Sequence, residues 1–589
     1  MNEKQPMETG TVLILDGDTV PALAIARSLG RQGIPVDIAS HQLSPISEYS
    51  RFVGNTHLYP HPLESNHQFL AWLEQQLSGN RYRLIIPATE RTLVPIARHF
   101  QNHPQADRIT MPALEALETV LDKARTTQLA VDCNVPQPQS WTISQMSELS
   151  DLEDRLHYPV VVKPGRSISD NEVRVPLTVR YAHSWEELVK IGHQLLEHVH
   201  LVLQEYFSGI GVGIELIACR GKILYAFQHQ RIHEMPLTGG GSSYRKSVEI
   251  DPQLLEASSR LIAHLNWHGV AMVEFKKNPR TGEFILIEIN GRFWGSLPLA
   301  TAAGADFPYQ LYQLYTSGTV TASNPYRREV YCRKLASDLA WLEAVVRRDA
   351  DTRLVSIPSI GSAIKDWLKI FSRHHYFDVQ SSQDLKPGLV DIGHIINNYL
   401  ERIFGIFRER AFRKKIIKRS HHRNLVNKLY GARNILFICY GNINRSAIAH
   451  VLADNILPDR GLHFRSAGFH PEGQRPADQR MVAIATEQGI PMEDFRSTSL
   501  TQELADWADL IFVMEAAHVT RLAELSEQAA AKAYLLGGLI IDSEACEIAD
   551  PYNQPEQIYQ ATYQKVAQCL AGMKTMLAIN RTGRSEPST

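Results

Sequence analysis

Two strand–helix patterns, one at the start of the chain and one in its last third, constrain most strongly what this sequence can fold into. In the first, apolar runs at 11–15 and 35–39 flank a helix pattern over 21–32. A second such pattern occupies 434–457, where an apolar strand precedes a polar loop and a helix. Strands and helices that alternate at this spacing predict parallel βαβ units. The 589 residues therefore contain at least two α/β domains.

The stretches between and around these patterns differ in character and divide the chain into four predicted regions. Residues 10–108 form a Rossmann-like domain, and 109–320 carry the longer alternating strands of an α+β domain. Residues 321–430 are predicted to be a helical linker region, because they contain few turn signals. Residues 431–577 form a C-terminal α/β domain with a parallel sheet. The predicted fold class is α/β multidomain.

Composition excludes several classes of protein. Hydrophobic residues make up 44 %, enough for a large core, and the net charge of −2 argues against a dedicated nucleic-acid binder. No apolar run has the length of a membrane span, and the polar start is not typical of a secretory signal. The six cysteines are scattered without a CxxC pair, so neither a disulfide framework nor a zinc site is indicated. We expect a cytoplasmic protein.

The clearest chemical signal lies between the strand and the helix of the second pattern. This loop consists of Cys439, Tyr440, Gly441, Asn442, Ile443, Asn444, Arg445 and Ser446. Loop N–H groups and a helix N-terminus point at an anion, and with Arg445 they favour a thiolate at Cys439. Arg445 can hold a phosphoryl group through two hydrogen bonds, and Ser446 can donate to the thiolate. A buried structural cysteine is the alternative interpretation.

A carboxylate that could complete this chemistry lies far downstream, in Asp550-Pro551-Tyr552. A thiol that attacks a phosphate ester needs a general acid to protonate the leaving phenol. Pro551 would stiffen the loop that aims Asp550, and Tyr552 could line the entrance for an aromatic substrate. An Asp-Pro pair alone is more often an ordinary turn.

Residues from about 433 to 575 resemble the low-molecular-weight protein tyrosine phosphatase family. The matches occur in family order: the Cys439 loop, Ser466-Ala467-Gly468, Gly473 with Pro476 and Asp478, Arg496-Ser497, Asp509 with Met514, and Asp550-Pro551-Tyr552. The resemblance implies Cys439 as nucleophile, Arg445 as phosphate clamp, and Ser446 and Asn442 as loop organisers. It implies Asp550 as general acid and then general base.

Two departures from the family pattern restrict this expectation. Many members carry a second cysteine inside the loop, at the position that Asn444 occupies here, so reversible protection by a disulfide within the loop is not expected. The thioredoxin-linked arsenate reductases of this fold carry a redox cysteine pair after the strand that corresponds to 510–514. Here Glu515-Ala516-Ala517-His518 follows, which disfavours arsenate reduction.

A second chemical signal ends a strand in the α+β region. Glu288 and Asn290 alternate on one strand and therefore point to the same face. With Glu274 on the preceding strand they form an all-oxygen set suited to Mg²⁺ that bridges phosphates. Arg292 lies two residues further on and could contact a transferring phosphate or an acyl phosphate.

Lysines and a possible hinge accompany this set. Lys163 ends an apolar run, and Lys123 lies in Asp122-Lys123-Ala124, so both could contact phosphate oxygens. The segment Gln204, Glu205, Tyr206 and Phe207 follows a strand and could present backbone groups to an adenine edge. A lysine at the end of a strand before a proline, such as Lys163, is more often simply a solvated strand end, and no one of these features is decisive alone.

Together these features resemble the ATP-grasp superfamily, with a pre-ATP-grasp domain ahead, over residues 10–320. The resemblance implies Mg²⁺ and ATP, a carboxylate activated as an acyl phosphate, and attack by a nucleophile that is usually an amine. Members usually carry a glycine-rich flap after the second lysine, but 165–169 contain one glycine. The glycine-rich run 238–243 is either a substrate flap, with Arg231 near its base, or a hairpin connection. Glu215 could hold the ribose.

A basic stretch separates the two halves. Residues 402–423 contain nine Lys or Arg and one acid, Glu409, interleaved with Ile403, Phe404, Phe407 and Phe412. Such a helix could make weak contact with a membrane surface, or it could be the solvated face of a packed linker helix.

The leading hypothesis is a bifunctional enzyme. Its first half would be an ATP- and Mg²⁺-dependent ligase acting on small carboxylate and amine substrates. Its C-terminal domain would be a cysteine-dependent phosphatase acting on a phosphorylated protein or a small phosphomonoester, with no nucleic-acid partner. Two alternatives remain: both domains could serve one pathway, or the ATP-grasp domain could be a nucleotide-sensing scaffold that regulates the phosphatase.

Overall fold

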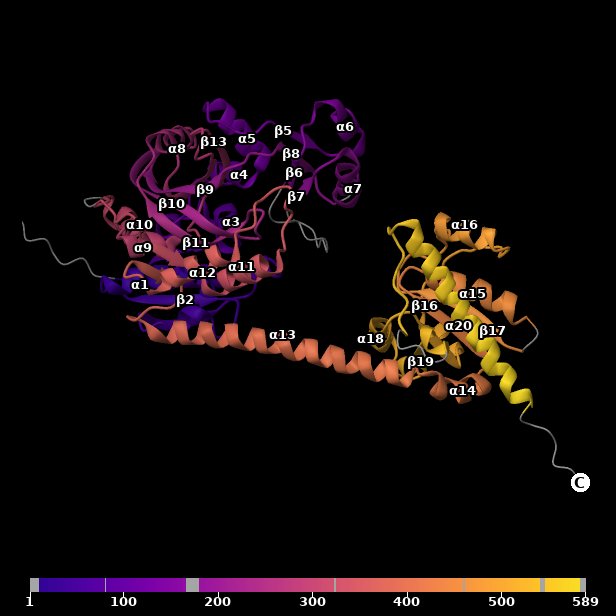
Figure 1. Cartoon of the computed structure of the whole chain (residues 1–589). Helices are drawn as coiled ribbons and strands as arrows, with labels where there is room; N and C mark the ends of the chain where they lie inside the picture. Colours follow the sequence, from indigo (N-terminus) through magenta and orange to yellow (C-terminus); the bar gives the residue numbers. More distant parts are fainter. Residues whose placement is uncertain are drawn as a thin grey trace, which may run out of the picture. The chain divides into compact units, whose positions relative to one another are not determined.

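The computed structural model describes residues 10–79, 81–165, 179–196, 198–321, 325–458, 461–540 and 546–582. The chain divides between Ile396 and Asn397 into two compact units (Figure 1). The helix α13 (Leu385–Arg419) contains the residues at which they divide. Among the described residues, no helix is long and apolar enough to cross a bilayer.

The first unit begins with the parallel sheet that the sequence predicts. Its strands are β1 (Thr11–Ile14), β2 (Val36–Ser40), β3 (Val53–Leu58) and β4 (Tyr82–Ile86), in the order β3-β2-β1-β4. The connecting helices are α1 (Val20–Arg31), α2 (Asn66–Ser78) and α3 (Glu90–Phe100). Thr19 caps α1, because its side chain accepts a hydrogen bond from the Ala22 backbone N–H. The chain order changes direction between β1 and β4, where open parallel sheets bind ligands.

An antiparallel four-stranded sheet follows, in the order β5-β8-β6-β7. Its strands are β5 (Ser140–Ile143), β6 (Val160–Pro164), β7 (Arg180–Ala182) and β8 (Leu201–Glu205). The helices α4 (Leu114–Leu121) and α5 (Lys123–Asp132) precede it, and α6 (Met146–Ser150) and α7 (Trp185–Leu195) pack on it. The strand β8, which contains the first two residues of the predicted hinge segment, is therefore paired on both sides, with β5 and with β6.

A seven-stranded sheet forms the centre of the first unit, in the order β13-β12-β9-β10-β11-β14-β15. Its long strands are β9 (Ile210–Cys219), β10 (Lys222–Met235), β11 (Gly241–Val248), β12 (Gly269–Lys277) and β13 (Phe284–Asn290), and its short ones are β14 (Tyr331–Arg333) and β15 (His375–Phe377). The helices around it are α8 (Pro252–His264), α9 (Leu297–Ala303), α10 (Phe307–Ser317), α11 (Leu335–Arg347) and α12 (Ile360–Leu368).

The region predicted as a helical linker thus also contributes strands. β14 pairs with β11, and β15 pairs with β14, so 331–377 extend the central sheet. Strands of three residues leave too short a pattern to be read from sequence. The glycine-rich run 238–243 lies in a hairpin, because 238–240 form most of the connection from β10 to β11 and 241–243 begin β11.

The second unit contains the predicted C-terminal parallel sheet, in the order β17-β16-β18-β19. Its strands are β16 (Asn434–Cys439), β17 (His463–Gly468), β18 (Leu510–Val513) and β19 (Ala533–Leu535). Its helices are α14 (His422–Gly431), α15 (Arg445–Ile456), α16 (Gln479–Glu487), α17 (Gln502–Trp507), α18 (Ala516–Leu525), α19 (Glu527–Ala531) and α20 (Glu556–Thr582).

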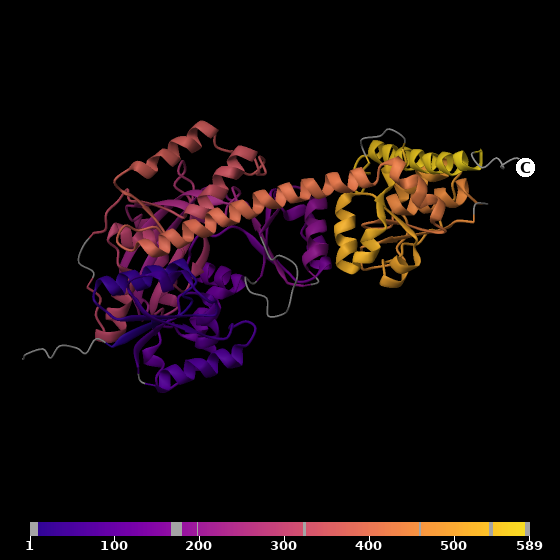
Figure 2. The same cartoon turned by 90° about the horizontal axis from the view of Figure 1, so that it is seen from below.

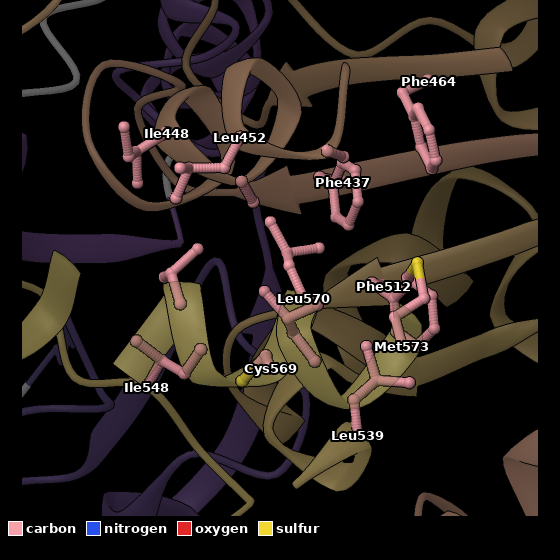
Figure 3. Packing of buried hydrophobic residues seen from close by; sticks show 14 of the residues in the cluster. Phe437, Ile448, Leu452, Phe464, Phe512, Leu539, Ile548, Cys569, Leu570 and Met573 are labelled. Atoms are coloured by element: carbon pink, nitrogen blue, oxygen red, sulfur yellow. The ribbon is translucent and has the colours of Figure 1, made fainter. Parts of the chain in front are cut away.

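Both faces of this sheet are buried, because successive side chains of a strand point to opposite sides. Phe437 and Phe512 enter the core beneath α15 and α20, together with Leu452 and Met573 (Figure 3). Leu436 enters a second core beneath α18, together with its neighbours on β18. In Figure 2 the yellow α20 lies beside the orange α15, on the same face of the sheet.

Residues before 431 belong to this packing. Leu425 and Leu429 of α14 are buried in the first core, and Ile416 near the end of α13 is buried in the second. The hydroxyl of Ser420 accepts a hydrogen bond from the Leu535 backbone N–H at 2.8 Å. The packed unit therefore includes the last turns of α13 and all of α14.

We expect a fragment that starts at 431 to be much less stable than one that starts at 397. In the 397–582 fragment, Leu425→Ala alone should lower the free energy of unfolding by about 2–4 kcal/mol. That loss should lower its Tm by about 5–15 °C, measured by circular dichroism. Leu400→Ala is the matched control, because Leu400 is 45 % exposed and should change stability by about 0.5 kcal/mol or less. If the fragment that starts at 431 melted at the same temperature as the one that starts at 397, the assignment of α14 to the core would be contradicted.

Candidate active sites

The cysteine loop connects the C-terminal end of β16 to the N-terminus of α15. Cys439 is 2 % exposed, and its Sγ lies 3.0 Å from the Ser446 hydroxyl and accepts a hydrogen bond from the Asn442 backbone N–H at 3.2 Å. The Asn442 side chain donates to the Ser446 hydroxyl at 2.8 Å and accepts from the Thr498 backbone N–H at 2.7 Å. Asn442 adopts a φ of 52°, which an asparagine tolerates better than most residues. These contacts hold the sulfur at the floor of the loop.

Arg445 lies beneath the same loop and joins it to two carboxylates. Its guanidinium pairs with Asp550 at 2.5 Å and with Glu515, and it donates to the Ile548 carbonyl at 2.9 Å. Arg445 is 1 % exposed, and its Nε has no hydrogen-bond partner among the described residues. A phosphoryl oxygen could supply that missing acceptor.

A cavity of about 250 Å³ opens above the sulfur. Its lining includes Cys439, Tyr440, Asn444, Asp550 and Tyr552. Tyr440 and Tyr552 are 45 % and 55 % exposed, so their rings form the mouth. The structure thus brings together the nucleophile, clamp and acid candidates that the sequence predicts.

Several residues at this site were not found by sequence reasoning. Glu515 follows β18, the neighbour of β16, and therefore reaches the same edge of the sheet. Arg475 lines the cavity and donates to the Gly441 carbonyl at 2.7 Å. His518 faces this charge cluster, where burial and the charges of Arg445 and Arg521 lower its pKa to about 4. The signal in the sequence that could have found Glu515 was its position two residues after a strand.

The second predicted site lies on the central sheet of the first unit. Glu274 and Glu288 are cross-strand partners on β12 and β13. The Asn290 amide donates to Glu274 at 3.2 Å and to Glu288 at 3.0 Å. Burial raises the pKa of Glu274 and Glu288 adds to this, although Arg231 pairs with Glu274 and opposes it. The two carboxylates, together with the oxygen of the Asn290 amide, fit the ligand set of Mg²⁺, with phosphate oxygens to complete it; the amide nitrogen that contacts both carboxylates here would have to give way to the cation.

A large cavity of about 930 Å³ adjoins this cluster. Its lining includes the predicted nucleotide and metal residues Lys123, Lys163, Gln204, Glu205, Tyr206, Phe207, Glu274, Glu288, Asn290 and Arg292. Burial and the charge of Lys123 lower the pKa of Lys163 to about 8. Arg292 lies 3.4 Å from Glu90 at the start of α3 and so connects the cluster to the first sheet.

Two predicted parts of the nucleotide site, Glu215 and the flap at 165–169, are not found among the described residues that line this cavity. Glu215 is fully buried and does not line the cavity; it accepts a hydrogen bond from Ser296 at 2.7 Å and lies 3.0 Å from the His229 ring. Residues 166–169 of the expected flap lie outside the described residues. The glycine-rich hairpin does contribute, since 239–241 line the cavity and Arg231 donates to the Gly240 carbonyl at 2.9 Å.

The same cavity continues to the point where the first sheet changes direction. Asp18, Thr19 and Thr89 line this part, after the carboxyl ends of β1 and β4. Asp16 lies beneath them and accepts hydrogen bonds from the Thr89 backbone N–H at 2.9 Å and the Thr92 hydroxyl at 2.6 Å. The predicted nucleotide residues and the first domain therefore face one common chamber.

Comparison with known proteins gives separate matches for the two halves. The family model described as "Low molecular weight phosphotyrosine protein phosphatase" matches 434–582. The low molecular weight protein-tyrosine-phosphatase Etp of Escherichia coli (strain K12) is 33 % identical over 130 residues, which cover 22 % of this chain and 84 % of Etp. The chain belongs to the low molecular weight protein-tyrosine-phosphatase family. The phosphatase Wzb of the same strain is 34 % identical over 130 residues, covering 22 % of this chain and 85 % of Wzb.

The phosphatase family accounts for the second unit alone. The model "ATP-grasp in the biosynthetic pathway with Ter operon" matches 197–337 of the first unit. An L-amino acid ligase from Bacillus licheniformis is 15 % identical with a TM-score of 0.42, over 52 % of this chain and 74 % of that one. The two family models show that the chain combines an ATP-grasp domain with a low-molecular-weight tyrosine phosphatase domain, and both family resemblances are confirmed.

We expect ATP affinity to fall as the pH rises above about 8. The Lys163 ammonium loses its proton there, whereas bound phosphate favours the charged form. The apparent Kd for Mg²⁺-ATP should rise by up to about tenfold per pH unit above that point, measured by calorimetry from pH 7 to 9.5. Lys163→Arg keeps its charge and should remove most of the slope. If the apparent Kd of the wild-type chain did not change with pH, Lys163 would not be a phosphate-binding residue.

Proposed function

We propose that the C-terminal unit hydrolyses phosphotyrosine through a cysteinyl-phosphate intermediate. The observation that carries the proposal is the arrangement of Cys439 beneath a cavity, with Arg445 between the loop and Asp550. The exposed rings of Tyr440 and Tyr552 at its mouth suit an aromatic leaving group. The protein-tyrosine-phosphatase names of Etp and Wzb support the same substrate class.

The proposed reaction has two steps. The Cys439 thiolate attacks phosphorus, the bond from phosphorus to the phenolic oxygen breaks, and Asp550 gives its proton to that oxygen. Asp550 then takes a proton from water, whose oxygen attacks the cysteinyl phosphate and displaces the thiolate as inorganic phosphate forms. Arg445 and the loop N–H groups hold the equatorial oxygens throughout. Ser446 and the Asn442 N–H stabilise the thiolate when it leaves.

We propose that the first unit joins a small carboxylate to an amine at the expense of ATP. A carboxylate oxygen attacks the γ-phosphorus, the bond to the β–γ bridging oxygen breaks, and ADP leaves. The amine nitrogen then attacks the acyl carbon, the phosphate leaves, and the amine loses a proton. Arg292 and Lys163 would stabilise the charge of the phosphate during these steps. Glu274, Glu288 and Asn290 would hold Mg²⁺, which neutralises phosphate charge when bound.

The common chamber supports a reaction that brings an acid and an amine together beside ATP. It extends from the predicted phosphate residues to Asp18, Thr19 and Thr89, which leaves room for an acid and an amine beside the nucleotide. Its lining contains charges of both signs, among them Asp18, Arg231 and Arg245. A polar or zwitterionic carboxylate suits such walls better than an apolar acid. We place the enzyme in the cytoplasm, where ATP is available.

A screen of carboxylates and amines for ADP release tests the ligase proposal. ADP should form only when an acid is present, and mass spectrometry should detect the amide product. ATP binding without acid-dependent ADP release for any substrate would favour a nucleotide sensor instead. For the phosphatase, a phosphotyrosyl peptide should release phosphate, whereas the matched phosphoseryl peptide should react far more slowly.

A further inference from the structure

One face of α13 in the second unit is apolar and is not covered by any part of the chain that the structure describes. Leu400, Ile403, Phe404 and Phe407 recur at the spacing of a single helical stripe. They are 45 %, 46 %, 66 % and 63 % exposed. Exposed phenylalanines on a continuous stripe are unusual on a solvated helix. The stripe therefore needs a partner that accepts apolar side chains.

The same face becomes basic towards the end of the helix. Lys414 lies seven residues after Phe407, and Arg410 and Lys418 lie one turn to either side of it. All three side chains are exposed, and none forms an ion pair with a described residue. The uncovered face thus presents apolar residues first and cations next.

The opposite face of the helix is fixed to the phosphatase domain. Ile416 is buried in the core beneath α18, and Phe412 packs against that core. Arg413 pairs with Glu547. Phe412, which sequence reasoning grouped with the other aromatic residues, is therefore an anchor and not part of the uncovered stripe. The anchor fixes which way the stripe and the cations point.

The charge pattern argues against a second copy of this helix as the partner. In a parallel pair, Arg410, Lys414 and Lys418 would face their own copies, and like charges would repel. In an antiparallel pair of this segment, the cations would face the apolar stripe of the other copy. An anionic bilayer satisfies both parts, because apolar side chains enter the interface while cations contact lipid headgroups.

We propose that this face of α13 docks the chain on an anionic phospholipid surface. The site consists of Leu400, Ile403, Phe404 and Phe407 with Arg410, Lys414 and Lys418. It would hold the phosphatase domain at the membrane without a spanning segment. The proposal is independent of the chemistry proposed for either active site.

Sedimentation of the full chain with vesicles tests the proposal. We expect binding to phosphatidylcholine vesicles that contain 30 % phosphatidylglycerol, at least tenfold weaker binding to pure phosphatidylcholine, and release at high salt. Phe404→Ser with Phe407→Ser, and separately Lys414→Glu with Lys418→Glu, should each weaken binding at least tenfold. Lys222→Glu with Arg280→Glu is the matched control, because it makes the same charge change at exposed positions elsewhere.

Three results would overturn the proposal. The first is unchanged vesicle binding by the Lys414 and Lys418 variant, and the second is tighter binding to a single-stranded oligonucleotide than to the anionic vesicles. The third is a dimer in light scattering that the Phe404 and Phe407 variant converts to a monomer. Hydrolysis of a small aryl phosphate at the wild-type rate shows that each variant is folded.

Discussion

Replacing Cys439 by serine is expected to abolish the hydrolysis of aryl phosphates by the full chain. The sulfur lies at the floor of the cavity and accepts a hydrogen bond from the Asn442 N–H. A serine hydroxyl would stay protonated there and would be a far weaker nucleophile. Loss of a nucleophile typically lowers kcat by about 10⁴-fold or more. Steady-state release of 4-nitrophenol measures the effect.

The control must separate loss of chemistry from loss of folding. Serine fits the position, so the melting curve should change little. Cys219→Ser replaces a half-buried thiol in the first unit and should leave hydrolysis at the wild-type rate. Vanadate binding should persist in the Cys439 variant if Arg445 and the loop N–H groups remain in place. Wild-type turnover by Cys439→Ser would show that another group is the nucleophile.

Replacing Glu288 by alanine is expected to remove the Mg²⁺ dependence of ATP binding and to abolish ADP release. Glu288 supplies one of the two carboxylates of the cluster and contacts the Asn290 amide at 3.0 Å. Glu274 would remain, but it already pairs with Arg231. Without the Glu288 carboxylate, the cluster has too little negative charge to hold a divalent cation between protein and phosphate. We expect the affinity for Mg²⁺-ATP to fall by about tenfold or more, or about 1.4 kcal/mol.

Calorimetry with ATP in the presence of Mg²⁺ or EDTA measures this effect directly. Glu283→Ala is the matched control, because Glu283 is an exposed carboxylate at the turn before β13. The control should keep the wild-type difference between Mg²⁺ and EDTA. An unchanged difference in the Glu288 variant would place the metal elsewhere.

The sequence predicted those parts of both sites that depend on one strand and the residues after it. Cys439 through Ser446 could be read because a strand, a polar loop and a helix follow one another directly. Glu288 and Asn290 could be read because alternation on a strand places them on one face. In both cases, local geometry determines where the side chains lie.

What the sequence could not predict depends on contacts between distant segments. Glu515 joins Arg445 only because β18 pairs with β16, and Glu215 proved to be buried against Ser296. The packing of Leu425 and Leu429 was missed because a short, mostly polar helix shows no sign of which domain it packs against. Tertiary packing determines such positions, and no local pattern records it.

We expect Asn444 to change how the phosphatase domain responds to oxidants. Its amide lies 3.4 Å from the Asp478 carboxylate, which also accepts a hydrogen bond from Tyr559 at 2.7 Å, so the position where many relatives carry a thiol belongs to a polar network. A sulfenic acid formed at Cys439 by peroxide finds no neighbouring sulfur in the loop with which to condense. Recovery then depends on a small thiol from outside that enters the cavity before a second oxidation makes the loss permanent. After exposure to peroxide, the enzyme would stay inactive for a time that depends on the concentration of small thiols in the cell.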